Sequence, residues 1–251
     1  MKQLDGKIAI VTGAASGFGE GIAEAYVAEG AKVVVADVNE SGARRVADIL
    51  GPNASAVTCD VSKRSQVEAM IDHCVQVFGV PDIVVNNAGV THDNQPMLRV
   101  SEAEFDRVFD INVKSIYHVT QAVLPHMRAQ GKGGVILNVG STAGIRPRPG
   151  LVWYNASKGA VNLLSRAMAV ELGPENIRVN AICPVMGLTA MFEQFLGMPD
   201  TPENRAKFLA TIPLGRFSEP KDIAAAAVFL GSDAASFMTG IEFPVDGGRT
   251  I

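Results

Sequence analysis

The chain has 251 residues, of which 47% are hydrophobic and 19% are charged. This composition is typical of a globular protein and excludes an extended disordered chain, and the length fits one domain or at most two. The formal net charge of −4 provides no general electrostatic attraction to nucleic acid or to an anionic membrane.

The N-terminal segment and the cysteines favour a reducing, cytoplasmic location. The segment MKQLDGKIAIVTG has no apolar stretch followed by a cleavage site, and no apolar run reaches the roughly 18 residues of a membrane span. Cys59, Cys74 and Cys183 are scattered and odd in number, which fits neither a disulfide framework nor a metal site. We therefore expect no bound metal.

Short Val- and Ile-rich runs predict strands that are buried on both faces. They lie at 7–12, 32–37, 55–60, 82–87, 134–140 and 177–183. The run 241–248 predicts a seventh strand. Pro244 favours an edge position for it, because proline cannot donate a hydrogen bond to a neighbouring strand.

Amphipathic segments predict helices between the strands, at 17–29, 40–50, 62–78, 104–130, 152–173 and 219–231. Ser62 is the predicted N-cap of the third helix, and Gly79 its predicted stop. The alternation of strands and helices predicts an α/β fold with a doubly wound parallel sheet, formed by residues 1–251 as a single domain.

A glycine-rich turn follows the first predicted strand and opens the first predicted helix. Gly13, Gly17 and Gly19 give the pattern T-G-x-x-x-G-x-G. Glycine allows backbone N–H groups to approach a diphosphate closely, and the helix N-terminus adds partial positive charge. In this strand–turn–helix context the pattern predicts a dinucleotide site, the alternative being a structural turn.

Asp37 ends the second predicted strand, 18 residues after Gly19. A carboxylate at this point would accept hydrogen bonds from an adenosine ribose and would repel a 2′-phosphate. The turn contains Ala15 and Ser16 with no Arg or Lys, and Val38 follows Asp37. These features favour NAD(H) over NADP(H), although Asp37 could also be a simple strand-end cap.

The segment 184–216 interrupts the alternation of strands and helices, and it is rich in Met, Phe and Pro. In doubly wound sheets the ligand lies outside the carboxyl ends of the strands. A long insertion after the sixth strand is therefore a candidate substrate lid, or else a structural helical hairpin.

Tyr154 and Lys158 are four residues apart in a predicted helix, so their side chains share one face. Alone, such a pair is typical of a solvated surface. With the glycine turn upstream it resembles a proton-transfer site of the short-chain dehydrogenase/reductase superfamily. TGAASGFG resembles the cofactor turn of that family, NNAG (86–89) its fourth-strand motif and YNASK (154–158) its Y-x-x-x-K signature.

The resemblance covers essentially the whole chain, including GRFSEPKDIAAAAVFL and TGIEFPVDGG near the C-terminus. It implies a Rossmann fold, a bound nicotinamide cofactor and a catalytic set of Asn112, Ser141, Tyr154 and Lys158. It assigns cofactor contacts to Gly13, Ser16, Gly17, Phe18, Gly19, Asp37, Asp60, Val61, Asn87, Ala88, Gly89, Tyr154, Lys158, Pro184, Val185, Gly187 and Thr189. Two departures are Gly140 in place of the first serine of N-x-S-S, and Val185 in place of the glycine after Pro184.

In this reading Tyr154 is the general acid for carbonyl reduction and the general base for alcohol oxidation. A free tyrosine has a pKa of about 10, and we expect the Lys158 cation to lower it. Ser141 would donate a hydrogen bond to the substrate oxygen, and Asn112 would connect Lys158 to solvent through a water molecule.

A further group of residues is predicted to line the substrate pocket. Large apolar side chains near the expected site suggest an aromatic or apolar substrate body, and arginine suits an anionic group. The candidates are His92, Gln95, Arg146, Arg148, Trp153, Met191 and Phe192. The two arginines could equally face solvent or a subunit contact. The surrounding stretches resemble a branch that includes dehydrogenases of sulfonated or carboxylated benzylic alcohols.

The predicted function is that of an NAD(H)-dependent alcohol dehydrogenase or carbonyl reductase. A 3-oxoacyl-[acyl-carrier-protein] reductase and a non-catalytic NAD-binding scaffold are the alternatives. The resemblance also implies a homotetramer built through the segments 104–130 and 152–173 and the C-terminal edge strand.

Overall fold

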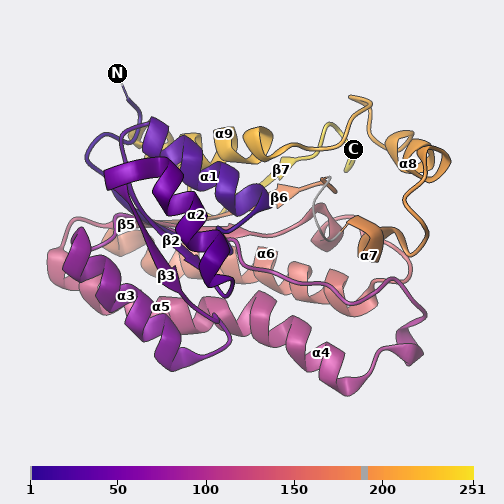
Figure 1. Ribbon diagram of the computed structural model, residues 1–251, viewed down its shortest axis with the longest axis horizontal. Coiled ribbons are helices and arrows are strands. Elements are labelled where there is room, and N and C mark those ends of the chain that lie inside the picture. Colours follow the sequence, from indigo (N-terminus) through magenta and orange to yellow (C-terminus); the bar gives the residue numbers. More distant parts are fainter. Residues whose placement is uncertain (1, 188–191) are drawn as a thin grey trace.

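The computed structural model describes residues 2–187 and 192–251, and its centre is one parallel sheet (Figure 1). Its strands are β1 (Ile8–Thr12), β2 (Lys32–Asp37), β3 (Ala54–Thr58), β4 (Ile83–Asn86), β5 (Gly134–Val139), β6 (Ile177–Pro184) and β7 (Glu242–Val245). They are arranged in the order β3-β2-β1-β4-β5-β6-β7. All seven predicted strands are present, and β7 occupies the predicted edge.

The helices lie between the strands, as the sequence predicted. They are α1 (Gly17–Ala28), α2 (Glu40–Leu50), α3 (Arg64–Val77), α4 (Glu102–Phe109), α5 (Ser115–Gln130), α6 (Val152–Leu172), α7 (Phe192–Leu196), α8 (Pro202–Leu209) and α9 (Pro220–Gly231). Short 3-10 turns lie at Gly51–Asn53, Met97–Arg99, Thr142–Gly144, Gly173–Glu175 and Asp233–Ala235. Among the helices of these described ranges, none is both long and apolar enough to cross a membrane.

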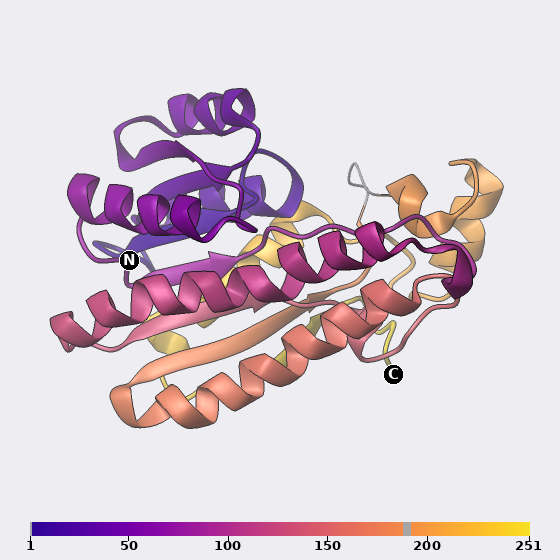
Figure 2. The ribbon, with the colours of Figure 1, turned by 90° about the horizontal axis from the view of Figure 1, so that it is seen from below.

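The helices cover both faces of the sheet (Figures 1 and 2). Helices α1, α2 and α9 pack on one face, where Ile22, Tyr26 and Leu230 belong to a buried core. Helices α3, α5 and α6 pack on the other face around Met70 and Val123. This arrangement confirms the predicted doubly wound α/β fold, because parallel strands need apolar cover on both sides.

Two local predictions are corrected. The predicted helix 104–130 is divided by a π-helical turn, Asp110–Lys114, between α4 and α5. Ser62 is not the N-cap of α3, since Lys63 holds that position. The Ser62 hydroxyl instead donates to the carboxylate of Asp60 at 2.7 Å. A local side-chain bond of this kind competes with helix capping.

The strand order reverses between β1 and β4, so a crevice opens there at the carboxyl ends of the strands. Because all seven strands are parallel, the segments that follow them all leave from this edge. Helices α7 and α8 and the C-terminus of the chain lie at the same end of the molecule (Figure 1).

Candidate active site

A cavity of about 450 Å³ lies at this edge of the sheet. Its walls include Gly13, Ser16, Gly17, Phe18, Asp37, Asp60, Val61, Asn87, Ala88, Gly89, Ser141, Arg146, Arg148, Tyr154, Lys158, Pro184, Val185 and Gly187. Most of the residues that the sequence singled out therefore surround one space, although they come from the segments that follow six different strands.

The turn after β1 brings backbone to the cavity wall. Gly13 and Gly17 have φ angles of 64° and 60°, a region that favours glycine. A Cβ on Gly13 would lie 2.8 Å from the Cα of Ala88, so a side chain there would close the crevice. The Ser16 side chain makes no cap hydrogen bond to α1, which leaves the first N–H groups of this helix for an anion.

Gly19 stands behind this turn and not on the cavity wall. A Cβ on Gly19 would lie 2.2 Å from the carbonyl oxygen of Gly13. The absence of a side chain at Gly19 lets α1 pack against the turn, which gives this glycine a packing role.

The Asp37 carboxylate is fixed by backbone donors at the end of β2. The Ala15 N–H donates to one oxygen at 3.0 Å, and the Asn39 N–H donates to the other at 2.9 Å. Arg45 from α2 approaches the same turn. Its guanidinium donates to the Ala15 carbonyl at 3.0 Å and to the Glu20 carboxylate at 2.8 Å.

Thr12 and Asn87 join the ends of β1 and β4. The Thr12 hydroxyl accepts from the N–H groups of Asn87 and Ala88, both at 3.1 Å. The Asn87 amide donates to the carbonyls of Thr12 and Gly13 at 2.9 and 3.0 Å. These bonds hold the crevice between the two strands at a fixed width.

Ser141, Tyr154 and Lys158 meet at the same part of the cavity. Ser141 follows β5, and its hydroxyl accepts from the Ala143 N–H at 3.0 Å. Tyr154 and Lys158 project from α6 and are only 7% and 5% exposed. The Lys158 ammonium donates to the carbonyl of Val139 at 2.8 Å, which ties α6 to the end of β5.

Burial dominates the protonation of this pair. It raises the pKa of Tyr154 to about 12, against weaker opposing effects of the Ser141 hydroxyl and the Arg148 guanidinium. It also lowers the pKa of Lys158 to about 8, because the ammonium has lost its water. The expected lowering of the Tyr154 pKa by Lys158 is therefore not found, and Tyr154 is a phenol at neutral pH.

Asn112 lies in the π-helical turn, just behind the cavity wall. Its side chain accepts from the Val90 N–H at 2.8 Å and donates to the Val90 carbonyl at 2.9 Å and to the Ser157 hydroxyl at 3.0 Å. A Cβ on Gly89 would lie 3.3 Å from both the Asn112 amide oxygen and the Lys158 nitrogen. Only Gly89 thus separates Asn112 from Lys158.

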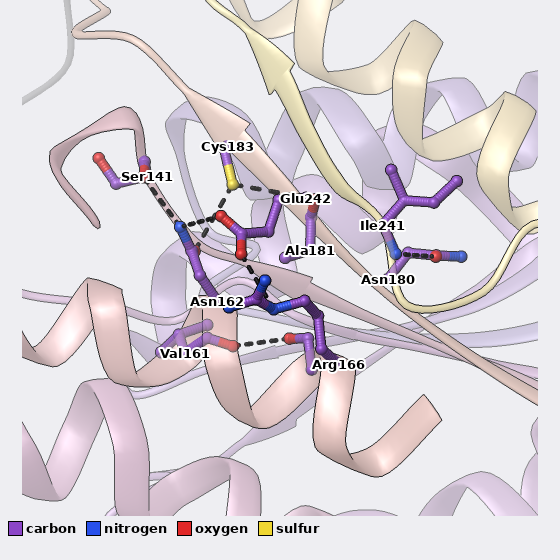
Figure 3. A network of polar contacts seen from close by, with 10 residues as sticks. Ser141, Val161, Asn162, Arg166, Asn180, Ala181, Cys183, Ile241 and Glu242 are labelled. Atoms are coloured by element: carbon purple, nitrogen blue, oxygen red, sulfur yellow. Dashed lines mark hydrogen bonds and ion pairs between the residues drawn. The ribbon is translucent and has the colours of Figure 1, made fainter. Parts of the chain in front are cut away.

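A polar network behind Ser141 links it to the edge strand (Figure 3). The Asn162 amide donates to the Ser141 carbonyl at 3.5 Å and to the Glu242 carboxylate at 3.3 Å. Glu242 pairs with Arg166 at 3.2 Å, and the Cys183 thiol donates to Asn162 at 3.5 Å. No pattern in the sequence marks Asn162, because its contacts depend on where β7 pairs.

The segment after β6 is only partly described. Pro184, Val185 and Gly187 line the cavity, and a Cβ on Gly187 would lie 2.7 Å from the Phe18 ring. Val185 takes the usual glycine position with both backbone groups bonded, to Val245 and to Ser218. Thr189 and Met191 lie outside the described residues.

Only two of the described substrate candidates reach the cavity, Arg146 and Arg148. The His92 ring is buried and bonds the Asp93 carbonyl at 2.8 Å, and the Gln95 N–H donates to the Gly150 carbonyl at 2.9 Å. The Trp153 ring packs edge-on against Phe105 of α4, with centroids 5.4 Å apart. Phe192 packs against Phe217. None of these four side chains lines the cavity: His92 and Gln95 lie in the loop after β4, and Trp153 and Phe192 contact Phe105 and Phe217 instead.

Residues outside the predicted list also shape the cavity, two of them in the predicted lid segment 184–216. Phe195, Phe208 and Arg249 line the cavity, and the Phe195 ring meets Tyr154 edge-on at 5.0 Å. Asn94 donates to the carbonyls of Pro149 and Phe195, both at 3.2 Å, and so joins α7 to the loop before α6. No local pattern marks Asn94 or Arg249, since the tertiary fold alone brings their segments to the cavity.

Comparison with known proteins identifies the family. A family model described as enoyl-(acyl carrier protein) reductase matches residues 13–250. A 4-formylbenzenesulfonate dehydrogenase of Comamonas testosteroni is 50% identical over 251 residues and 99% of each chain. A 7alpha-hydroxysteroid dehydrogenase of Escherichia coli is 40% identical over 98% of this chain and 95% of its own.

The fold also matches a solved structure over its whole length. The crystal structure of 3-ketoacyl-(acyl-carrier-protein) reductase from Brucella melitensis complexed with NADH has a TM-score of 0.93 and 46% identity, over 99% of this chain and 100% of that one. The chain belongs to the short-chain dehydrogenase/reductase superfamily. As a short-chain dehydrogenase/reductase it is an oxidoreductase that acts on CH–OH groups.

The cavity fits the nicotinamide cofactor that short-chain dehydrogenases/reductases use. The glycine cradle at Gly13 and Gly187 is open where a Cβ would obstruct it, and a helix N-terminus faces the same space. Asp37 and the Ser141–Tyr154–Lys158 group line the same cavity.

Proposed function

We propose that this protein is an NAD(H)-dependent dehydrogenase that interconverts an alcohol and its carbonyl compound, with Tyr154 as the acid or base. The observation that carries this proposal is the shared cavity. Ser141, Tyr154 and Lys158 line the same space as the glycine turn and Asp37. A reacting carbon beside Tyr154 is therefore next to the cofactor cradle.

The protein's own residues handle the proton and the substrate oxygen. When bound, the nicotinamide cofactor supplies or accepts the hydride. During reduction the Tyr154 phenol donates its proton to the carbonyl oxygen, and Ser141 donates a hydrogen bond to the same oxygen. During oxidation Tyr154 accepts the proton of the alcohol. Lys158 would supply positive charge to the phenolate that reduction leaves, and Asn112, one glycine away, would hold a water molecule through which Lys158 exchanges protons with solvent.

A preference for NAD(H) over NADP(H) is supported by charge. The Asp37 carboxylate lines the cavity where a 2′-phosphate would have to fit, and like charges repel. Arg45 approaches the same turn, but its charge is matched by Glu20 at 2.8 Å. Arg45 therefore attracts a phosphate less strongly than an arginine without a carboxylate partner would.

Residues 1–251 are proposed to form one domain, with the segment 184–216 as a substrate lid. Phe195 and Phe208 of this segment line the cavity, and Phe195 contacts Tyr154. These rings suit an aromatic alcohol or aldehyde, the class to which the substrate named for the Comamonas testosteroni relative belongs.

A homotetramer in the cytoplasm is the proposed state of the protein. Helices α5 and α6 expose Tyr117, Leu163 and Val170 at 55%, 59% and 82%, which suits an intersubunit face. All three cysteines are buried and free, as expected in a reducing compartment. Light scattering coupled to size-exclusion chromatography tests the assembly, and a monomer would contradict it.

A screen of alcohols and ketones with NAD(H) and NADP(H) tests the proposed reaction. Absorbance of the reduced cofactor should rise with NAD⁺ and a benzylic alcohol, and Tyr154→Phe should abolish the rise while cofactor binding persists. The likeness to a 3-ketoacyl-(acyl-carrier-protein) reductase complexed with NADH favours a second candidate, reduction of 3-oxoacyl thioesters. Faster turnover of an acetoacetyl thioester than of any aromatic compound would support that candidate instead.

A further inference from the structure

Three arginines meet at the wall of the cavity that also holds Tyr154. Arg146 and Arg148 belong to the loop before α6, and Arg249 is the third residue from the end of the chain. The Arg146 guanidinium donates to the Arg249 carbonyl at 2.7 Å, which fixes the C-terminal tail against the loop. A cluster of three positive charges is thus assembled from segments about a hundred residues apart.

Within the described ranges, no carboxylate forms an ion pair with any of the three. In contrast, Arg44, Arg45, Arg64, Arg128, Arg166, Arg205 and Arg216 each pair with Asp or Glu. The carboxylate nearest in sequence, Asp246, is occupied by its own turn. It accepts from the N–H groups of Gly248 and Thr250 and from the Thr250 hydroxyl.

The Arg249 guanidinium also has an unused donor. Its Nη1 atom is buried and has no hydrogen-bond partner among the described residues. Buried donors are nearly always satisfied, and an unsatisfied one costs roughly 1–3 kcal/mol. A donor of this kind in a cavity wall indicates a ligand acceptor.

The positive charges of the three arginines repel one another, and burial deprives Arg148 and Arg249 of water. Burial and, to a smaller extent, the neighbouring Arg249 together lower the pKa of Arg148 to about 10. Burial lowers the pKa of Arg249 as well, with Arg146 acting in the same direction. An anion among them would relieve both the repulsion and the lost hydration.

Aromatic rings accompany the arginines and the catalytic tyrosine. The Arg148 guanidinium lies over the Phe208 ring, 4.6 Å from its centroid, and the Phe195 ring contacts Tyr154. The cavity wall therefore offers an apolar, flat surface beside the cations as well as beside the acid or base.

We propose that Arg148 and Arg249 bind an anionic group, a carboxylate or a sulfonate, on an aromatic substrate whose reacting carbon lies at Tyr154. Guanidinium groups suit both anions because two N–H donors match two oxygens. Arg146 holds Arg249 in place and adds charge. The anion site depends on the proposed function in one respect only, which is that the reacting carbon of the substrate lies at Tyr154.

Isothermal titration calorimetry of the protein with NADH bound tests the anion site without turnover. Benzoate and benzenesulfonate are compared with the neutral benzamide and benzenesulfonamide. We expect the anions to bind at least tenfold more tightly. The ratio of anion affinity to amide affinity should fall by about tenfold or more in Arg249→Gln and in Arg148→Gln, as expected for the loss of a charged hydrogen bond.

Two variants serve as controls for folding and for general charge. Arg64→Gln removes an exposed arginine that pairs with Glu68 on α3, away from the cavity, and should retain the full preference for anions. Arg249→Lys keeps the charge and should retain part of it. Equal affinity for anions and amides, or a loss of preference in Arg64→Gln, would overturn the proposal. So would a fall in NADH affinity in Arg249→Gln, since it would assign the arginine to the cofactor.

Turnover of 4-(hydroxymethyl)benzoate and 4-(hydroxymethyl)benzamide separates this proposal from the proposed function. A higher kcat/KM for the carboxylate, lost in Arg249→Gln, supports both. Tight anion binding without turnover of either alcohol leaves the anion site standing and overturns the proposed reaction. Equal turnover of both alcohols leaves the reaction standing and overturns the anion site.

Discussion

The ammonium group of Lys158 donates a 2.8 Å hydrogen bond to the carbonyl oxygen of Val139, at the end of β5. Lys158 is almost completely buried, and that burial lowers its pKa to about 8. The bond holds α6 against the strand that leads to Ser141. One side chain thus connects two elements of the proposed active site and carries a destabilising charge.

Lys158→Met should make the protein more stable and inactive. The folded pKa lies below that of the unfolded chain, so the unfolded state binds more protons between about pH 8 and pH 10.4. Wild-type stability should therefore rise with pH across this window, and the Lys158 charge should cost up to about 3 kcal/mol below it. Met removes this cost but leaves the Val139 carbonyl without its donor, so we expect a net gain of about 1–2 kcal/mol at pH 7.

Thermal unfolding of both proteins at pH 7 and pH 10 measures this effect. The melting temperature of the variant should be higher at pH 7 by about 2–6 °C, and the difference should shrink at pH 10. A variant that is less stable at pH 7 would contradict the lowered pKa of Lys158.

Alcohol oxidation should accelerate as the pH rises. Burial raises the pKa of Tyr154 to about 12, so the phenolate that accepts the proton is scarce at neutral pH and increases with each pH step. We expect kcat/KM for oxidation to rise between pH 7 and pH 10, by up to tenfold per pH step. Carbonyl reduction uses the phenol and should show no such rise. Equal pH dependence in both directions would argue against Tyr154 as the proton carrier.

Asp37→Asn should weaken the preference for NAD(H). The substitution removes the charge that would repel a 2′-phosphate, while the side chain keeps nearly the same shape. It can accept only one of the two backbone bonds that Asp37 now accepts, so stability should fall by about 1 kcal/mol. We expect the ratio of kcat/KM for NAD⁺ over NADP⁺ to drop at least tenfold. The exposed Asp48→Asn is the matched control and should leave the ratio unchanged.

Asn162→Ala should lower kcat more than it raises KM. Asn162 bonds the Ser141 carbonyl and the Glu242 carboxylate from behind the cavity, so its loss frees the Ser141 loop without touching the cofactor wall (Figure 3). We expect a tenfold fall in kcat with cofactor affinity within about twofold, and a stability loss of about 1–3 kcal/mol. Arg166→Gln, which breaks only the outer, half-exposed pair with Glu242, should change kcat little. A fall of kcat in both variants would point to general destabilisation.

Asn94→Ala should raise the substrate KM and leave the cofactor KM unchanged. The Asn94 side chain joins the Pro149 and Phe195 carbonyls, and so holds the α7 wall of the cavity against the loop that carries Arg148. Without it we expect a fivefold or larger rise in the substrate KM. Asn204→Ala, which removes a comparable bond to Pro199 on the exposed side of α8, is the control. An equal rise in both variants would show that the whole segment, and not this tether, sets the substrate KM.

The sequence by itself determined the strands, the helices, the glycine turn and the Tyr154–Lys158 pair. Continuous apolar strands need a helical layer on each face of the sheet. The glycine turn depends on the backbone conformation of neighbouring residues, which the local sequence determines. Tyr154 and Lys158 are fixed by one helical turn, so their relationship is also local. These features depend on neighbours along the chain, and for that reason they could be predicted.

Only the tertiary structure decided the protonation of Tyr154 and the composition of the substrate wall. The pKa of a side chain depends on how much water the whole fold removes from it, and here burial outweighs the charge of Lys158. His92, Gln95, Trp153 and Phe192 are close in sequence to the site but are turned into other contacts. Arg249 and Phe208 lie far away in sequence and reach the cavity because β7, α8 and the loop before α6 all end at the same edge of the sheet.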